Sequence, residues 1–105
     1  MYIYNVTTNI ERSIAQEWLQ WVQRKQIPAM LATGKFLEAK LSQVMVEEAQ
    51  GITYSIQYTA ESKEMLELYL KEDEMALQKE EMQLFRAQLV SFKTELKVIH
   101  HINNL

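Results

Sequence analysis

Two kinds of hydrophobic periodicity alternate along this chain, and their order constrains the fold more than any other feature of the sequence. Apolar and aromatic residues alternate with polar ones in the first ten residues, twice between residues 36 and 59, and again over residues 90–98. The stretches between these runs follow the helical period. The predicted order is therefore strand, helix, strand, strand, helix, strand.

The first predicted helix follows a strand that begins at Tyr2, and Asn9 is a candidate for its N-cap. Pro28 disfavours helical geometry in the residue before it, so we expect a break or kink near Gln26 and a short second helical piece ending at Thr33. Gly34 stands where a left-handed cap would end that piece. The apolar face of the helix consists of Ile10, Ile14, Trp18, Trp21 and Val22.

The second half of the chain begins with two predicted strands, 36–47 and 52–59, joined by a loop at 48–51. Gly51 can take a positive φ in that loop. Ser62 is a plausible N-cap for the second helix. Asp73 interrupts the apolar stripe of this helix, either because the stripe borders solvent or because the helix breaks there. We favour a break.

Two such strand–helix–strand units with right-handed crossovers predict an α+β fold, the ferredoxin-like βαββαβ plait. Its four-stranded antiparallel sheet has the spatial order 4-1-3-2, with both helices on one face and the first helix broken near Pro28. A chain of 105 residues has room for one domain, which we expect to span residues 1–105.

The alternating residues of each strand indicate what the two sheet faces carry. We expect the tyrosines of the central strands to face the helices, together with Val90, Phe92, Leu96 and Val98 of the last strand. The open face would then be polar, with Ser91, Lys93, Glu95 and Lys97. Without exposed aromatic rings to stack bases, and with a net charge of −3, the chain is not expected to bind nucleic acid.

The second strand differs from the others because its apolar residues point both ways. A β-bulge near Ser42 would reverse the phase and explain this pattern. We prefer cover by a second copy of the chain, because an edge strand that is apolar on both sides favours aggregation. The predicted homodimer interface comprises Leu37, Ala39, Leu41 and Met45.

Few residues in this chain can support catalysis. Without cysteine there are no disulfides, thiolate nucleophiles or zinc fingers, and two glycines cannot form a phosphate-binding loop. His100 and His101 are adjacent near a strand end and would point to opposite faces, so we expect no metal site. No signal peptide or membrane span is apparent, which predicts a soluble cytoplasmic protein without membrane contact.

Two tryptophans are the best candidates for binding a small molecule. Trp18 and Trp21 are three residues apart on an apolar face, which is typical of core residues but also suits the wall of a pocket. Asn5 and Gln57 are polar candidates for the same ligand-binding site. A further stripe, formed by Leu68, Met75 and Met82 at heptad spacing, would be exposed on a straight helix.

Several segments resemble, over essentially the whole chain, a small bacterial family known only as a domain of unknown function. They are residues 18–22 (WLQWV), 27–28 (IP), 31–36 (LATGKF), 54–60 (YSIQYTA) and 92–96 (FKTEL). That family resembles the dimeric α/β-barrel superfamily. The resemblance implies dimers that pair their open sheet faces, with ligand sites between sheet and helices, in enzymes and inactive proteins alike.

The resemblance also bears on activity. Relatives carry His-Ile-Pro-Asp where residues 26–29 read QIPA, and the glutamine at Gln26 cannot titrate. Haem-degrading relatives carry a ligating histidine on the second helix, and none occurs in residues 61–86. Asn5 resembles a polar residue of some oxygenases.

The sequence therefore favours a homodimeric, non-catalytic binding or interaction domain without a cofactor. A small-molecule enzyme of the cofactor-free monooxygenase type, or a ligand binder, is the alternative. A regulatory module of the amino-acid-sensing kind is less favoured, because the first strand–helix loop has no glycine for close ligand approach.

Overall fold

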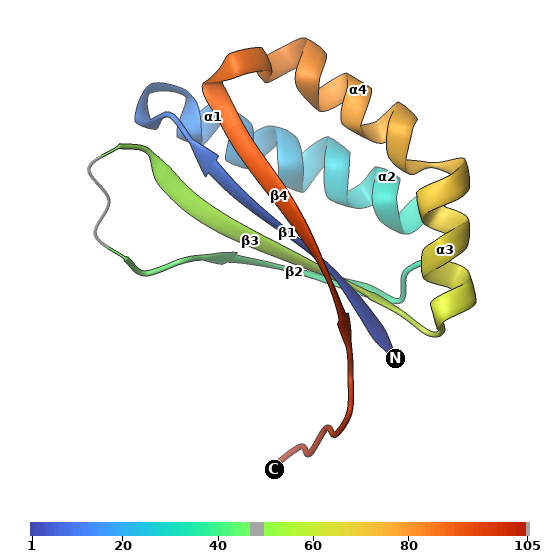
Figure 1. Ribbon diagram of the computed structural model, residues 1–105. Helices are drawn as coiled ribbons and strands as arrows, with labels where there is room; N and C mark the ends of the chain where they lie inside the picture. Colours follow the sequence, from blue (N-terminus) through green and yellow to red (C-terminus); the bar gives the residue numbers. More distant parts are fainter. Residues whose placement is uncertain (47–49, 105) are drawn as a thin grey trace.

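A four-stranded antiparallel sheet carries all the helices on one face, in a computed structural model that describes residues 1–46 and 50–104 (Figure 1). The strand order is β2-β3-β1-β4, which is the predicted 4-1-3-2 order read from the other edge. The α+β, ferredoxin-like βαββαβ plait is therefore confirmed. The strands are β1 (Tyr2–Ile10), β2 (Glu38–Gln43), β3 (Ile52–Ala60) and β4 (Leu89–Lys97).

Two strand ends differ from the sequence prediction. β1 continues to Ile10, so Asn9 lies in the strand and not at a helix N-cap, and its Nδ2 donates to Thr53 Oγ1 at 3.2 Å. The predicted strand 36–47 is shortened to Glu38–Gln43. Its expected end at residue 47 and the loop residues 48 and 49 lie outside the described residues, and Gly51 has the predicted positive φ of 75°.

The first helical region is distorted near the predicted point but does not end there, because Val22, Gln26 and Ile27 keep right-handed helical dihedral angles. A 3-10 turn, η1 (Arg12–Ile14), leads into α1 (Ala15–Trp21), a π-helical segment η2 (Val22–Gln26) and α2 (Ile27–Ala32). Pro28 lies in the first turn of α2, directly after the π-helical segment. Gly34 follows with a φ of 78°, the left-handed conformation expected after a helix C-terminus.

The second helical region is two helices, α3 (Lys63–Glu72) and α4 (Glu74–Phe85), so the break at Asp73 is confirmed. Ser62 caps α3 as predicted, because its Oγ accepts a hydrogen bond from the Met65 N–H at 3.2 Å. A 3-10 turn, η3 (Arg86–Gln88), connects α4 to β4. The stripe of Leu68, Met75 and Met82 is exposed despite the break.

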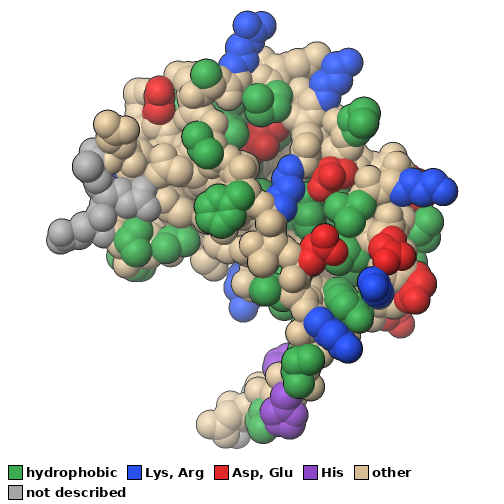
Figure 2. Space-filling model, in the orientation of Figure 1, with side chains coloured by type: hydrophobic (Ala, Val, Ile, Leu, Met, Phe, Trp, Pro, Cys, Tyr) green, Lys and Arg blue, Asp and Glu red, His purple; other side chains and the backbone are tan. Residues whose placement is uncertain are grey.

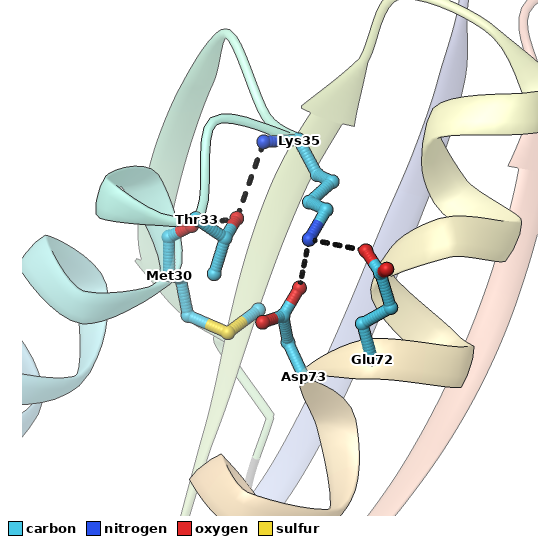
Figure 3. Close-up of polar contacts among 5 residues, drawn as sticks. All are labelled: Met30, Thr33, Lys35, Glu72 and Asp73. Carbon is cyan, nitrogen blue, oxygen red and sulfur yellow. Dashed lines mark hydrogen bonds and ion pairs between the residues drawn. The ribbon is translucent and has the colours of Figure 1, made fainter.

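Lys35 links the two helical regions at this break. Its Nζ lies 2.6 Å from Asp73 Oδ2 and 2.9 Å from Glu72 Oε1 (Figure 3). These contacts, first with Asp73 and then with Glu72, raise the pKa of the Lys35 ammonium. Thr33 orders the same turn, because its Oγ1 donates to the Met30 carbonyl at 2.7 Å and accepts from the Lys35 N–H at 3.2 Å.

The core lies between the sheet and the helices and is rich in aromatic rings. Tyr4, Tyr54 and Tyr58 of the central strands point into it, as the alternation predicts. Trp18 is fully buried and stacks on Tyr54, with the ring centroids 5.3 Å apart. The tyrosines of β1 and β3 therefore form the surface on which the helices pack.

The last strand is turned the other way from the prediction. Phe92 pairs with Thr7, and Leu96 with Ile3, on the face that carries no helix. Val90, Phe92 and Leu96 are 69%, 63% and 38% exposed on this open face. Val98, two residues after Leu96, also lies on the open face. The helix side of β4 carries Ser91, Lys93, Glu95 and Lys97. The prediction of a polar open face is therefore wrong at β4. The open face carries one aromatic ring, that of Phe92, whereas the central strands expose no aromatic ring there.

Candidate functional site

A small cavity lies between the sheet and the helices, beneath Trp18. Its volume is about 30 Å³, enough for about one water molecule. Strands supply its floor, and helices supply its roof. Its lining comprises Tyr4, Val6, Thr8, Trp18, Gln26, Met30, Ile56, Tyr58, Tyr69, Gln78, Glu81 and Lys93.

Glu81 brings an acidic group into this cavity. Trp18 Nε1 donates a hydrogen bond to Glu81 Oε2 at 3.0 Å. Burial raises the pKa of the Glu81 carboxyl, and the Trp18 bond and the charge of Lys93 offset only part of that rise. The fold therefore favours the protonated form of Glu81 more than water does.

Three phenols surround the same space. The Tyr4 hydroxyl donates to a carboxylate oxygen of Glu74, and the Tyr4 and Tyr69 rings lie 5.2 Å apart. Burial is the main cause that raises the pKa of Tyr4, Tyr58 and Tyr69. These groups therefore remain neutral hydrogen-bonding partners at ordinary pH and cannot serve as bases.

Two amide groups in the cavity have atoms without a partner. Gln26 Oε1 and Gln78 Nε2 are buried and make no hydrogen bond among the described residues. Gln26 ends the π-helical segment η2, and π-helical turns are frequent at functional sites. Gln26 therefore faces the cavity with an amide, a group that does not titrate.

The four residues predicted to share a ligand site do not meet in one pocket. Trp18 lines the cavity, but Trp21 packs against Phe85, with the ring centroids 5.4 Å apart. Asn5 and Gln57 are paired on β1 and β3 and lie on the open face. The sheet therefore separates them from both tryptophans.

The residues predicted for a dimer interface are also divided. Ala39 and Leu41 point to the helix side and pack against the core of their own chain. Leu37 and Met45 lie outside β2 and are exposed. An interface at the predicted edge thus depends on Leu37 and Met45, and it stays a prediction.

A second and larger hollow lies on the open face. It has a volume of about 460 Å³ and is lined by both apolar and polar residues. His100 and His101 both line it, because the segment there has left the strand, but no group of three or more metal-ligating side chains forms among residues 1–46 and 50–104. The lining comprises Met1, Ile3, Glu38, Ala39, Lys40, Gln57, Thr59, Val98, His100 and His101.

Sequence analysis did not identify Glu81 and Gln78 as residues of a cavity. Glu81 lies four residues after Leu77 and four before Phe85, on the stripe that packs inward. That spacing was the available signal. Nothing comparable identifies Gln26 and Gln78, whose amides meet only after the helices pack.

Comparison with known structures shows the fold. A dimeric ferredoxin-like protein from an uncultured marine organism has a TM-score of 0.74 and 12% identity over 96% of this chain and 97% of its own. The haem-degrading protein MhuD of Mycobacterium tuberculosis, solved with two haems bound, has a TM-score of 0.69 and 12% identity over 98% and 100%. The cofactor-independent oxygenase SnoaB of Streptomyces nogalater, in a mutant form, has a TM-score of 0.67 and 11% identity over 98% of both chains.

Among the described residues, no helix has the length and hydropathy needed to cross a membrane.

Two further comparisons used the sequence alone. No curated protein matches the chain. A family model matches residues 1–99, and the chain therefore belongs to the family described as "Domain of unknown function (DUF4286)".

Proposed function

We propose that the protein is a homodimeric, non-catalytic binding domain in which two copies pair through the open faces of their sheets. The observation that carries this proposal is the orientation of β4. Val90, Phe92 and Leu96 project from the open face, two of them more than 60% exposed. Exposed apolar side chains grouped on one sheet face are typical of an interaction surface.

The distribution of charge supports pairing through this face. The segment 61–86, with eight acidic and four basic residues, carries −4 of the net charge. Its helices α3 and α4 lie on the other side of the sheet (Figure 1). Among the strand residues of the open face only Glu38 and Lys40 are charged, and their signs are opposite. Two copies can therefore approach without bringing like charges together.

The contents of the cavity support the absence of catalysis. Its volume of about 30 Å³ leaves no space for an organic substrate. The amide of Gln26 cannot transfer a proton as a general acid or base. The carboxyl of Glu81 is engaged by Trp18. A structural neighbour described as a dimeric ferredoxin-like protein adds support for two chains as the working unit.

The mass of the protein in solution tests this proposal. We expect light scattering after gel filtration to give twice the chain mass of 12.4 kDa for the wild type. Phe92→Ser should shift the protein toward the monomer. The matched control is Met75→Ser, which removes a large apolar side chain that is exposed on α4 instead, and it should leave the dimer intact. A monomeric wild type would contradict the proposal.

A second candidate is a small-molecule enzyme of the cofactor-free monooxygenase type, or a ligand binder. It is favoured by Glu81, Gln26 and Gln78, whose polar atoms converge between sheet and helices. It requires the cavity to open around a ligand. A cofactor-independent oxygenase and a haem-degrading protein share the fold at low identity.

Thermal-shift screening against flavins, haem and quinones tests this candidate. A ligand at 100 times its dissociation constant stabilises the folded state by about 2.7 kcal/mol. Under this candidate Trp18→Phe should abolish the shift, because it removes the donor to Glu81. Trp21→Phe, which alters a ring outside the cavity, should keep it. No shift with any compound in the screen would count against the candidate.

A further inference from the structure

We infer that residues 98–104 form an arm that lies against a second copy of the chain and completes the interface on the open face. This inference rests on the homodimer proposed above. It concerns which segments make the interface and how the hollow on that face is closed.

The arm leaves the body of its own chain. Val98 N–H donates to the Met1 carbonyl at 2.9 Å and ties the start of the segment to the first strand. Beyond that point the segment projects away from the sheet (Figure 1), and the space-filling view shows its histidines well outside the rounded body (Figure 2). Ile99 and Ile102 are 83% and 73% exposed on it. Two isoleucines on an extended segment are suited to apolar contact with another surface.

The area of the open face leads to the same conclusion. Three strands of nine residues and one of six, about 4.8 Å apart at about 3.3 Å per residue, cover roughly 520 Å². A stable interface buries about 800 Å² on each partner. The sheet face alone therefore falls short by roughly 280 Å². An extended segment of seven residues, about 23 Å long and about 10 Å wide, supplies roughly 230 Å², which is most of that shortfall.

The hollow of about 460 Å³ shows where the second copy would sit. Three strands form its floor, and Val98, His100 and His101 form a wall on one side. In one copy the hollow stays open to solvent, because the sheet and the arm line it without closing it. A second copy seated on the open face would fill this space and lie within reach of the arm.

The charges around the hollow fit a copy of the same chain. Glu38 and Lys40 are two residues apart on β2 and both line the hollow. In a twofold interface the same patch meets itself, so a patch with both signs can place the acid of each copy near a base of the other. The exposed isoleucines of the arm follow β4 in the chain, whose Phe92 and Leu96 are exposed on the open face.

Photo-cross-linking tests whether the arm contacts the second copy. The photoreactive residue p-benzoylphenylalanine replaces Ile102 in one variant and Met75 in the control, both of which are exposed side chains. After irradiation we expect a covalent product of twice the chain mass from the variant at position 102 only. If the variant at position 102 gives only single-chain products while the wild type is a dimer, the proposed contact between the arm and the second copy is wrong.

The strength of the dimer gives the second readout. Ile99→Asn combined with Ile102→Asn should raise the dimer dissociation constant at least about 100-fold in sedimentation analysis, whereas Met75→Asn should leave it unchanged. An unchanged dimer dissociation constant in the double variant would contradict the proposed role of the arm but not the dimer through the open faces. A wild type that is monomeric at every concentration overturns both.

Discussion

Glu81 is an acidic residue of α4 whose carboxyl lies in the cavity beneath Trp18. Its folded-state pKa is raised above the ordinary 4.5, mainly by burial. The folded state therefore binds the proton more tightly than the unfolded state does. Stability from this group is greatest below pH 4.5, declines as the pH rises to the raised folded-state value, and stays reduced above it.

We predict that Glu81→Gln stabilises the protein at neutral pH. The amide keeps an oxygen that can accept from Trp18 Nε1 but carries no charge to be buried. Urea unfolding at about pH 4 and about pH 7.5 measures the effect, and the gain should shrink at the lower pH. Glu80→Gln, on the exposed side of α4, is the control and should change little at either pH. Equal stability of the wild type and Glu81→Gln at both pH values would be inconsistent with a buried acid.

Lys35 is a base whose partners come from the break between α3 and α4. We predict that Lys35→Met lowers the urea midpoint, because Asp73 and Glu72 lose the ammonium that lies between them. The raised pKa of Lys35 means that this contribution is present at neutral pH and is lost only as the pH rises through its folded-state pKa. The control is Lys63→Met, which removes a lysine 3.9 Å from Glu67 on the exposed surface and should have little effect. Equal midpoints for the two variants would show that Lys35 does not hold the break.

At the scale of elements, local signals located several helix ends, although Asn9, the predicted first N-cap, lies in β1. Pro28, Gly34 and Ser62 act through backbone geometry or one nearby hydrogen bond, and each marks a boundary where the sequence predicts one. The break at Asp73 was likewise visible because an acid interrupts an apolar stripe. Such features depend on residues close in sequence, and the element order that they define is enough to predict the ferredoxin-like plait.

The orientation of β4 shows what local signals cannot supply. Alternation establishes that Val90, Phe92 and Leu96 share a face, but it does not say which face. Pairing with β1 decides this, and it places Phe92 beside Thr7 on the side without helices. The same limit applies to the cavity, where Gln26 and Glu81 come together only through packing of elements distant in sequence.

The two glycines give a matched test at the scale of elements. Both have positive φ, but a Cβ on Gly51 would lie 2.5 Å from Asn9 Oδ1 and 2.7 Å from the Ile10 carbonyl oxygen, whereas one on Gly34 would meet nothing within 4 Å. We predict that Gly34→Ala costs about 1 to 2 kcal/mol of unfolding free energy from backbone strain. Gly51→Ala should cost at least about 1 kcal/mol more, because the carbonyl of β1 must move. Urea unfolding measures both, and a smaller loss at Gly51 would contradict the packing of the hairpin against β1.

At the scale of the whole molecule, the two surfaces differ in chemistry. The helix side covers the aromatic core and carries the acidic segment, while the open side presents Phe92, Leu96 and the hollow. One face of the sheet is apolar and packs against the helices, and the other face also carries apolar side chains at β4. Such a sheet is suited to packing against a second layer of protein on its open face. In this family member the second layer would be another copy, so folding and association would be linked.

That linkage predicts how thermal stability depends on protein concentration. If two copies associate only when folded, mass action stabilises the folded state as the concentration rises, and the Tm of the wild type should increase with each tenfold step. Phe92→Ser should remove the dependence, because it weakens the association, while its Tm at the lowest concentration stays close to that of the wild type. Met75→Ser should retain the wild-type slope. Differential scanning calorimetry from about 5 to about 500 μM, a range of about two tenfold steps and hence about 2.7 kcal/mol in association free energy, measures this. A wild-type Tm that is constant over that range would contradict coupling between folding and pairing.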